Sequence, residues 1–305
     1  MTTQSSQSNI KTDVFSIVNN RIIEQLEKGT VPWRQPWSEA GPPRNLISGR
    51  PYRGLNVLLL ASLGYPYNLF LTLKQINELG GTVRKGEHAC PVVFWSQKEG
   101  ELDEKGEKEI KRILRYYSVF NFDQCINIPE NKIPDLRWND EQPIETCEQV
   151  VNNMPMKPKI LHKTPEAFYN PSLDIINMPK RTSFVSSESY YTTLFHELVH
   201  STGHERRLAR EAVMKVEKYG SEPYSEEELV AQIGACFLSA HTSCSMKHFE
   251  NDAAYIAGWL KRLNDDKRFL LFASAKAQRA VDYILNVQFS SIPEDAETEN
   301  AQTGQ

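Results

Sequence analysis

The sequence predicts an α+β fold in two parts, a small α+β domain followed by a mainly helical one. Three observations predict it. Apolar side chains recur at helical spacing over residues 12–28. The run 91–95 and the alternating run 113–122 are typical of two antiparallel strands. Further along the chain, helical periodicity returns over residues 188–201 and 225–238.

The first part contains two helices with clear start and stop signals. We expect one to begin after Asp13 and to end at Gly29, and a shorter one to begin after Thr72 and to end at Gly80. Between the two predicted strands, residues 98–112 mix both charges densely around two glycines. Such a stretch favours a solvated hairpin tip.

The length of 305 residues fits two domains, and an apolar content of 40% is enough to build their cores. Prolines are frequent between residues 128 and 158, which predicts little regular structure there. The expected organisation is a disordered N-terminus (1–11), a first domain (12–130), a linker (131–158), a second domain (159–290) and an acidic disordered tail (291–305).

Composition limits the context and the partners. The first eight residues lack the basic start and hydrophobic segment of a signal peptide, and no apolar run approaches the roughly 20 residues of a membrane span. We therefore expect a cytoplasmic protein without a membrane partner. The five cysteines are odd in number and show no C-x-x-C spacing, so we expect reduced, mostly buried thiols and no disulfide framework or cysteine zinc finger.

The strongest chemical signal is an H-E-x-x-H pattern at His196, Glu197 and His200. On a helix, residues four apart lie on one face, so both imidazoles can bind one metal ion while Glu197 lies beside it. This pattern is typical of zinc hydrolases, in which the glutamate is the general base. The alternative is a chance match on a polar helix face. The capped, amphipathic context of residues 188–201 favours a site for Zn²⁺ or another divalent ion.

Metal sites of this kind use a third protein ligand. We expect it to be Glu228, on a helix that begins after Ser225, with Gln232 one turn further along the same face. Three alternatives stay open. Glu227 could be the ligand, or Glu228 could serve only as the capping-box partner of Ser225. His204, close to the pattern in sequence, is a further possible donor.

The elements around the pattern are also predictable. Ser186 and Ser187 supply an N-cap for the helix that carries it, and Gly203 can end that helix in a left-handed cap. Upstream, residues 174–178 form a predicted strand, which precedes the helix as the edge strand of a substrate cleft does. An extended peptide substrate could pair with this strand.

The first part of the chain carries a different signal. Residues 30–95 hold seven basic and three acidic residues, a local charge of +4, and prolines interrupt regular structure while aromatic and basic side chains alternate. Such mixtures bind single-stranded nucleic acid, because bases stack on flat rings and basic groups contact phosphates. The alternative for each ring is core packing. The predicted DNA-binding residues are Trp33, Arg34, Trp37, Arg44, Tyr52, Arg53, Arg84 and Lys85.

Long motifs in both parts resemble one family. The matching stretches are 29–37, 52–60, 80–87 and 92–95 in the first part and 168–174, 195–204 and 227–231 in the second. The first set resembles the single-stranded DNA-binding domain of ArdC-type antirestriction proteins, which is also found in front of TraC-type plasmid primases. The second set resembles the zincin-like metallopeptidase domain of the same family. One departure is Gln232, where relatives tend to have a second glutamate.

The resemblance implies a plasmid- or mobile-element-borne protein that binds single-stranded DNA and protects incoming DNA from host restriction during conjugation. It also implies that His196, His200 and Glu228 hold the metal, and that a host restriction-system protein is the substrate or target. Two classes of function stay open: a DNA-guided zinc peptidase, and a DNA-coating or primase-accessory protein whose metal domain is structural or binds a partner. Replacing Glu197 with Gln discriminates between them, because it removes the base and spares the ligands.

Overall fold

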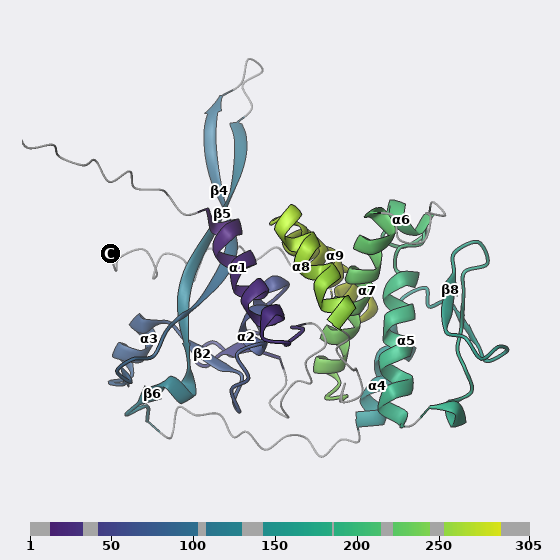
Figure 1. Cartoon of the computed structure of the whole chain (residues 1–305), viewed down its shortest axis with the longest axis horizontal. Helices are drawn as coiled ribbons and strands as arrows, with labels where there is room; N and C mark the ends of the chain where they lie inside the picture. The colour runs from purple at the N-terminus through teal and green to yellow at the C-terminus, as the bar shows by residue number, and fades with distance from the viewer. Residues whose placement is uncertain are drawn as a thin grey trace, which may run out of the picture.

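The computed structural model describes residues 13–32, 42–102, 108–129, 143–184, 186–214, 222–244 and 253–287. The fold is α+β, as the sequence predicts, with a sheet-containing group of elements at one end and a mainly helical group at the other (Figure 1). Trp33, Arg34 and Trp37, together with the predicted disordered ends of the chain, lie outside the described residues.

Helices and strands alternate irregularly along the chain, and β4 and β5 are much longer than the other strands. The helices are α1 (Val14–Glu27), α2 (Leu55–Ala61), α3 (Leu73–Glu78), α4 (Pro143–Asn153), α5 (Ser187–Ser201), α6 (Glu211–Met214), α7 (Glu222–His241), α8 (Ala253–Asp265) and α9 (Phe269–Ile284). The strands are β1 (Arg44–Asn45), β2 (Leu69–Leu71), β3 (Thr82–Val83), β4 (Cys90–Leu102), β5 (Lys108–Asn121), β6 (Cys125–Ile126), β7 (Lys159–Leu161), β8 (Phe168–Asn170) and β9 (Ile175–Asn177).

The predicted start signals in the first part are confirmed. The Asp13 side chain accepts a hydrogen bond from Phe15 N at the start of α1. Just after α1, Gly29 has a φ of 79°, a left-handed conformation that glycine adopts without strain. Helix α3 starts with a capping box between Thr72 and Gln75.

The first sheet has the strand order β1-β2-β5-β4, and β4 pairs with β5 in the predicted antiparallel manner. The pairing continues beyond Trp95 as far as Leu102, with a register shift after Glu99. Much of the charged stretch 98–112 therefore lengthens the hairpin. In Figure 1 the far end of this hairpin extends away from the rest of the fold.

The stretch expected to be a linker contains a helix. Helix α4 buries Cys147, Val150 and Val151 against the second part of the protein. These three residues share one helix face through their i, i+3, i+4 spacing. Pro143, which counted against regular structure, is the first helical residue, a position where its missing N–H is not needed.

In the second part, β9 is the central strand of the order β7-β9-β8. It is parallel to β7 and antiparallel to β8. The expectation that residues 174–178 pair with an extended substrate is therefore wrong, because both hydrogen-bonding edges of β9 are already used. The edge strand β8 packs against α5.

Helix α5 starts as predicted, since the Ser186 side chain accepts a hydrogen bond from Ser189 N. Its end differs from the expectation. Gly203 is not left-handed, and instead it allows a close approach, because a Cβ there would lie 2.4 Å from Val213 Cγ2. Helix α7 begins at Glu222, so Ser225 lies inside the helix and is not its N-cap. That position removes the capping-box alternative for the acids that follow.

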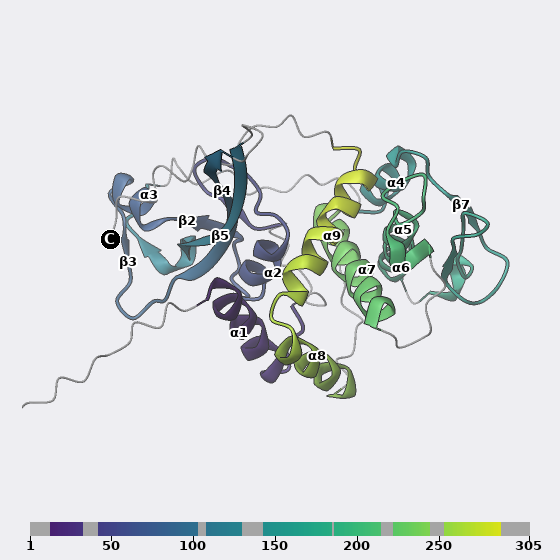
Figure 2. The ribbon, with the colours of Figure 1, turned by 90° about the horizontal axis from the view of Figure 1, so that it is seen from above.

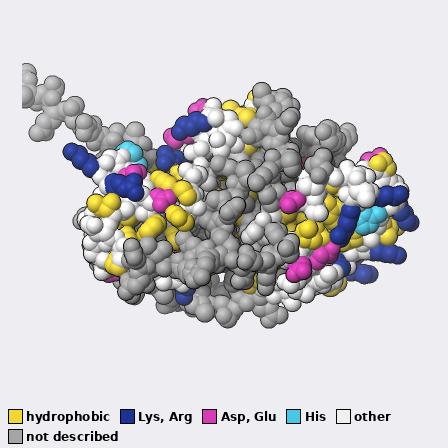
Figure 3. Space-filling model, turned by 90° about the horizontal axis from the view of Figure 1, so that it is seen from below, with side chains coloured by type: hydrophobic (Ala, Val, Ile, Leu, Met, Phe, Trp, Pro, Cys, Tyr) yellow, Lys and Arg dark blue, Asp and Glu magenta, His cyan; other side chains and the backbone are white. Residues whose placement is uncertain are grey.

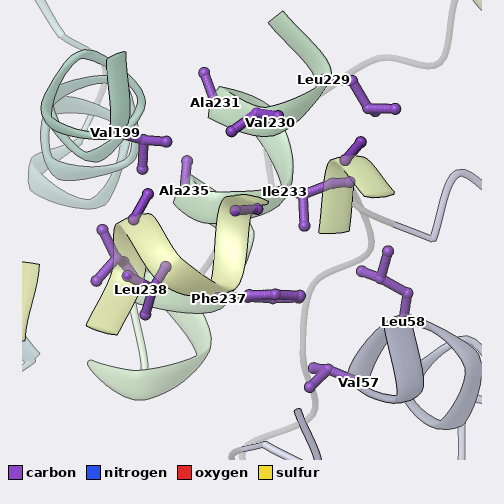
Figure 4. Close-up of a cluster of buried hydrophobic side chains, with 14 of the residues drawn as sticks. Val57, Leu58, Val199, Leu229, Val230, Ala231, Ile233, Ala235, Phe237 and Leu238 are labelled. Atoms are coloured by element: carbon purple, nitrogen blue, oxygen red, sulfur yellow. The ribbon is translucent and has the colours of Figure 1, made fainter. Parts of the chain in front are cut away.

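One hydrophobic core runs through both parts of the protein. Helix α7 packs against α5 and α9, and α9 also contacts α2 (Figure 4). Figure 2 shows α1 beside α8 and α2 beside α9. The five cysteines are free and buried, as expected. Among the described helices, none has the length and apolar character needed to cross a bilayer.

Candidate metal centre

Helices α5 and α7 bring the predicted ligands together. On α5, the Nε2 atoms of His196 and His200 lie 3.0 Å apart. From α7, Glu228 faces both rings, with Oε2 3.5 Å from the Nε2 of His196 and Oε1 3.5 Å from the Nε2 of His200. Within the described ranges, these three residues are the group of His, Cys, Asp and Glu side chains whose donor atoms could hold one metal ion.

The spacing of the donor atoms fits a small divalent cation. A tetrahedral ion with bonds of about 2.0–2.1 Å holds its ligand atoms roughly 3.3 Å apart. The two imidazole nitrogens are 3.0 Å apart, and each lies 3.5 Å from a different oxygen of the Glu228 carboxylate. Two imidazole nitrogens and a carboxylate oxygen are also the donor set of several catalytic zinc sites, which keep the fourth position for water.

The electrostatics of this site favour a cation. Burial alone would lower the pKa of His200, but hydrogen bonds and charges from Glu227 and Glu228 raise it to about 10. Burial would raise the pKa of Glu228, yet the hydrogen bonds to His196 and His200 lower it overall. A proton on an imidazole thus supplies the positive charge that two neighbouring carboxylates require.

Glu227 adjoins Glu228 in sequence but faces the opposite side of the His200 ring. Its Oε1 lies 3.2 Å from Nδ1 of His200. Arg210 donates from Nη2 to Oε1 at 2.6 Å and from Nε to Oε2 at 2.9 Å. Burial would raise the pKa of Glu227, but the hydrogen bonds from Arg210 and His200 lower it overall. Both carboxylate oxygens are therefore engaged away from the Nε2 atoms, which favours Glu228 as the ligand.

Glu197, the predicted general base, is buried on α5 with 7% of its surface exposed. No described residue gives its carboxylate a hydrogen bond or an ion pair. Such a carboxylate is available to accept a proton from water.

The residues that follow α5 have structural roles. His204 is buried, and its Nδ1 accepts a hydrogen bond from Arg206 N at 3.2 Å, outside the donor group. Arg207 has a fully buried side chain that donates to Ser201 O at 2.6 Å and pairs with Asp174. Since Asp174 directly precedes β9 and Ser201 is the last residue of α5, Arg207 connects the three-stranded sheet to the end of α5.

Two predicted DNA-binding residues pack within the fold. Tyr52 is half-buried, with its ring edge-on to Phe70 and 6.2 Å between the ring centres, so the core-packing alternative describes it. Arg53 pairs with Asp282 of α9 at 2.5 Å. The sequence interpretation could not foresee this pair, because its partners are separated by 229 positions in the chain.

The other predicted basic residues are nearer the surface. Arg44 is half-buried in β1, while Arg84 and Lys85 are exposed after β3, where Arg84 also donates to the carbonyl of Asp123. Basic side chains are visible at both ends of the face shown in Figure 3. Charge alone therefore does not select one DNA-binding surface.

The β4–β5 hairpin carries exposed rings that the sequence interpretation missed. Trp95 is 39% exposed and Tyr116 is 46% exposed. Across the strands, Tyr116 lies opposite Val93. The next pair on the same face is Trp95 with Leu114, and the exposed Arg112 belongs to the pair after that. The period-two alternation of the two predicted strands was the signal that could have revealed this face.

Two histidines four residues apart on one helix, faced by a glutamate from a second helix, define a zincin-like site. A family model described as zincin-like metallopeptidase matches residues 145–276, which include both helices. A second family model, the N-terminal domain of anti-restriction factor ArdC, matches residues 12–120.

Solved structures of an antirestriction protein are similar over nearly the whole chain. The metal-free crystal structure of ArdC from the R388 plasmid is 36% identical, has a TM-score of 0.72, and is matched over 91% of this chain and 100% of that one. The Mn(II)-bound structure of ArdC from the same plasmid is 34% identical with a TM-score of 0.69, over 96% and 100%. The chain belongs to the ArdC family of antirestriction proteins.

Other relatives are similar over different shares of their length. The uncharacterized protein y4eC of Sinorhizobium fredii (strain NBRC 101917 / NGR234) is 31% identical, over 90% of this chain and 92% of y4eC. Two proteins called DNA primase TraC, both from Escherichia coli, are 32% and 30% identical over 93% of this chain. The chain spans only 20% and 28% of the length of these two primases.

Proposed function

We propose that this protein binds single-stranded DNA and protects incoming plasmid or mobile-element DNA, and that its zincin-like half is a metal-dependent peptidase acting on a host restriction-system protein in the cytoplasm. One observation carries the peptidase proposal. The donor atoms of His196, His200 and Glu228 converge, and Glu197 beside them is a buried carboxylate to which none of the described residues gives a hydrogen bond or an ion pair. A purely structural metal site has no need for such a base.

His196, His200 and Glu228 would hold a divalent ion, Zn²⁺ or another. The Mn(II)-bound structure of ArdC from R388 supports a divalent ion in this fold. When bound, such an ion polarises a peptide carbonyl and lowers the pKa of bound water toward about 7. Because the ligands project from two regular helices anchored in one core, their donor atoms are held in place before binding.

Glu197 would act as the general base. Its carboxylate would accept a proton from the attacking water and return it to the leaving amine as the peptide bond breaks. Low exposure favours this role, because a carboxylate with little surrounding water interacts more strongly with the reacting groups. The ligands and the base thus have separate tasks.

The comparison of Glu197→Gln with the parent chain tests the peptidase proposal. The amide preserves shape and leaves all three ligands, so metal content and single-strand binding should be unchanged. Peptide hydrolysis should fall by about 100-fold or more, and protection of DNA in a conjugation assay should fall with it. The matched control is Glu226→Gln, at an acid that pairs with Lys276 at 2.7 Å. Full protection by Glu197→Gln would refute the peptidase role.

That outcome would favour the alternative function, a non-catalytic single-stranded DNA-coating or primase-accessory protein whose metal domain is structural or binds a partner. The similarity to part of each TraC primase supports this alternative. Such a protein would protect DNA with metal bound and would not need Glu197.

For DNA binding, two exposed rings of the β4–β5 hairpin supplement the predicted residues. Trp95 and Tyr116 offer two diagonal rings for base stacking, with Arg112 next on the same face. Arg84 and Lys85 remain candidates for phosphate contacts because both are exposed. Stacking on aromatic rings contributes about 1–3 kcal/mol per base, and it does not depend on base identity.

Two variants of the full chain separate these contributions. Trp95→Ala should weaken single-strand binding by roughly tenfold with little change in its salt dependence. Lys85→Ala should reduce the salt slope by about 0.7. The matched controls are Phe272→Ala and Arg279→Ala, at exposed residues of α9. Equal effects of Trp95→Ala and Phe272→Ala would exclude the hairpin as a DNA contact, and equal effects of Lys85→Ala and Arg279→Ala would exclude Lys85.

A further inference from the structure

We propose that Glu227 and Arg210 are positioning residues that orient His200 toward the metal ion. The inference rests on the proposed metal site and adds to it two residues that bind no metal themselves. They would fix the rotation of the imidazole ring and determine which of its two nitrogens carries the hydrogen.

Glu227 is placed to control the far side of the ring. Its Oε1 lies 3.2 Å from Nδ1 of His200, while Nε2 of the same ring faces Glu228 at 3.5 Å. A hydrogen on Nδ1 that is donated to Glu227 leaves the lone pair of Nε2 directed at the metal position. The carboxylate therefore selects the tautomer that a metal ion needs.

Arg210 forms a bidentate pair with this carboxylate. Its Nη2 and Nε donate to the two oxygens of Glu227 at 2.6 and 2.9 Å. The side chains of Arg210 and Glu227 are only 10% and 8% exposed, so solvent competes little for these hydrogen bonds. Two hydrogen bonds from one guanidinium fix the plane of the carboxylate as well as its distance from Arg210.

The guanidinium is in turn attached to the helix that carries His200. It donates from Nη2 to the carbonyl of Val199 at 2.8 Å and from Nη1 to Oγ1 of Thr202 at 2.6 Å. This series of hydrogen bonds therefore starts at His200 on α5 and returns to α5 at Val199. Because both anchors are within two residues of His200, rotation of the ring must disturb a set of part-buried hydrogen bonds that returns to the same helix.

The test measures metal affinity of the full-length chain, by competition with a chelator for Zn²⁺, in Glu227→Ala, Glu227→Gln and Arg210→Lys. Glu227→Ala should weaken Zn²⁺ binding by about 10- to 100-fold. Glu227→Gln should lose clearly less, because its amide oxygen still accepts the Nδ1 hydrogen. Arg210→Lys keeps the positive charge but cannot form the bidentate pair with Glu227, so it should also weaken Zn²⁺ binding. Glu226→Gln is the control, and its affinity should match that of the parent.

The comparison of Gln with Ala separates positioning from a structural role. If Glu227 serves only as the ion-pair partner of Arg210, both variants lose that pair equally and should bind Zn²⁺ equally. The visible spectrum of bound Co²⁺ gives a second readout, since it should change in Glu227→Ala and not in Glu226→Gln. Thermal unfolding of each variant in the presence of chelator shows whether that variant is folded. If Glu227→Ala does not fold, Glu227→Gln and Arg210→Lys decide the question.

Two failures can be told apart. If His200→Ala retains the parent affinity for Zn²⁺, the metal site itself is wrong. If His200→Ala abolishes binding while Glu227→Ala, Glu227→Gln and Arg210→Lys all bind as the parent does, the site stands and the positioning role is overturned.

Discussion

The crossing of α5 and α7 gives a prediction that links packing to the metal site. At this crossing a Cβ on Gly234 would lie 2.6 and 2.9 Å from the two methyl groups of Val199. Figure 4 shows Val199 directed from α5 toward α7. Carbon atoms in contact prefer about 3.5–4.0 Å, so Gly234→Ala should push the two helices apart by several tenths of an ångström or more. Valine cannot turn aside easily, because a helix restricts its χ1 angle.

Two opposing effects set the magnitude. Alanine is more favourable than glycine inside a helix by about 0.8–1.0 kcal/mol. Overpacking of a filled core costs about 1–3 kcal/mol. Gly234→Ala should therefore lower the free energy of unfolding by up to about 2 kcal/mol. Since Val199 precedes His200 and Gly234 is on the helix of Glu228, the same separation should weaken metal binding.

The assay is a double-mutant cycle by urea unfolding in chelator, with metal affinity measured in parallel. Val199→Ala alone should cost about 2 kcal/mol, because it removes two buried methyl groups and leaves a cavity. In the double variant the new methyl group fills that cavity, so the loss should be at least about 1 kcal/mol smaller than the sum of the single losses. The control is Gly258→Ala on α8, where a Cβ meets nothing within 4 Å. If Gly234→Ala stabilises the protein as this control does, close packing does not set the helix spacing.

Three further outcomes are expected. His200→Ala should abolish metal content, and chelation should lower the melting temperature of the parent but not of this variant, because binding adds to folding free energy. Arg53→Ala should lower the free energy of unfolding by about 1 kcal/mol or less, through loss of its half-exposed pair with Asp282, as measured by urea unfolding. Burial opposes ionisation of Asp174, but hydrogen bonds led by the one from Arg207 lower its pKa overall. The ionised carboxylate therefore adds to the free energy of unfolding above about pH 4, and this contribution should disappear on acidification. Arg207→Met should make the free energy of unfolding less dependent on pH in this range.

Local rules predicted the elements that depend on a few neighbouring residues. The cap at Asp13, the cap at Thr72 and each strand of the β4–β5 hairpin follow from signals within about ten residues. The convergence of His196 and His200 is equally local, since it depends only on the helical repeat. These features needed no knowledge of the rest of the chain.

Features that depend on distant partners were not predictable in this way. The sequence favoured Glu228 as the third ligand but could not exclude Glu227, because that choice depends on Arg210, which lies in a separate segment and engages Glu227. Strand β9 was expected at an edge, but β7 pairs with it in parallel from a position earlier in the chain. Parallel pairing leaves no short turn in the sequence as a signal.

The domain boundary expected near residue 130 does not coincide with a boundary of the hydrophobic core. A small cavity between the two parts is lined by Val18, Leu55 and Val93 from the first and by Leu270 and Leu271 from α9. A fragment ending at residue 130 would expose these apolar surfaces to water, at about 25 cal/mol per Å². Loss of DNA binding in such a fragment would therefore report its folding as much as its DNA contacts. The DNA-binding role has to be tested in the full chain, where α8 and α9 cover the first part.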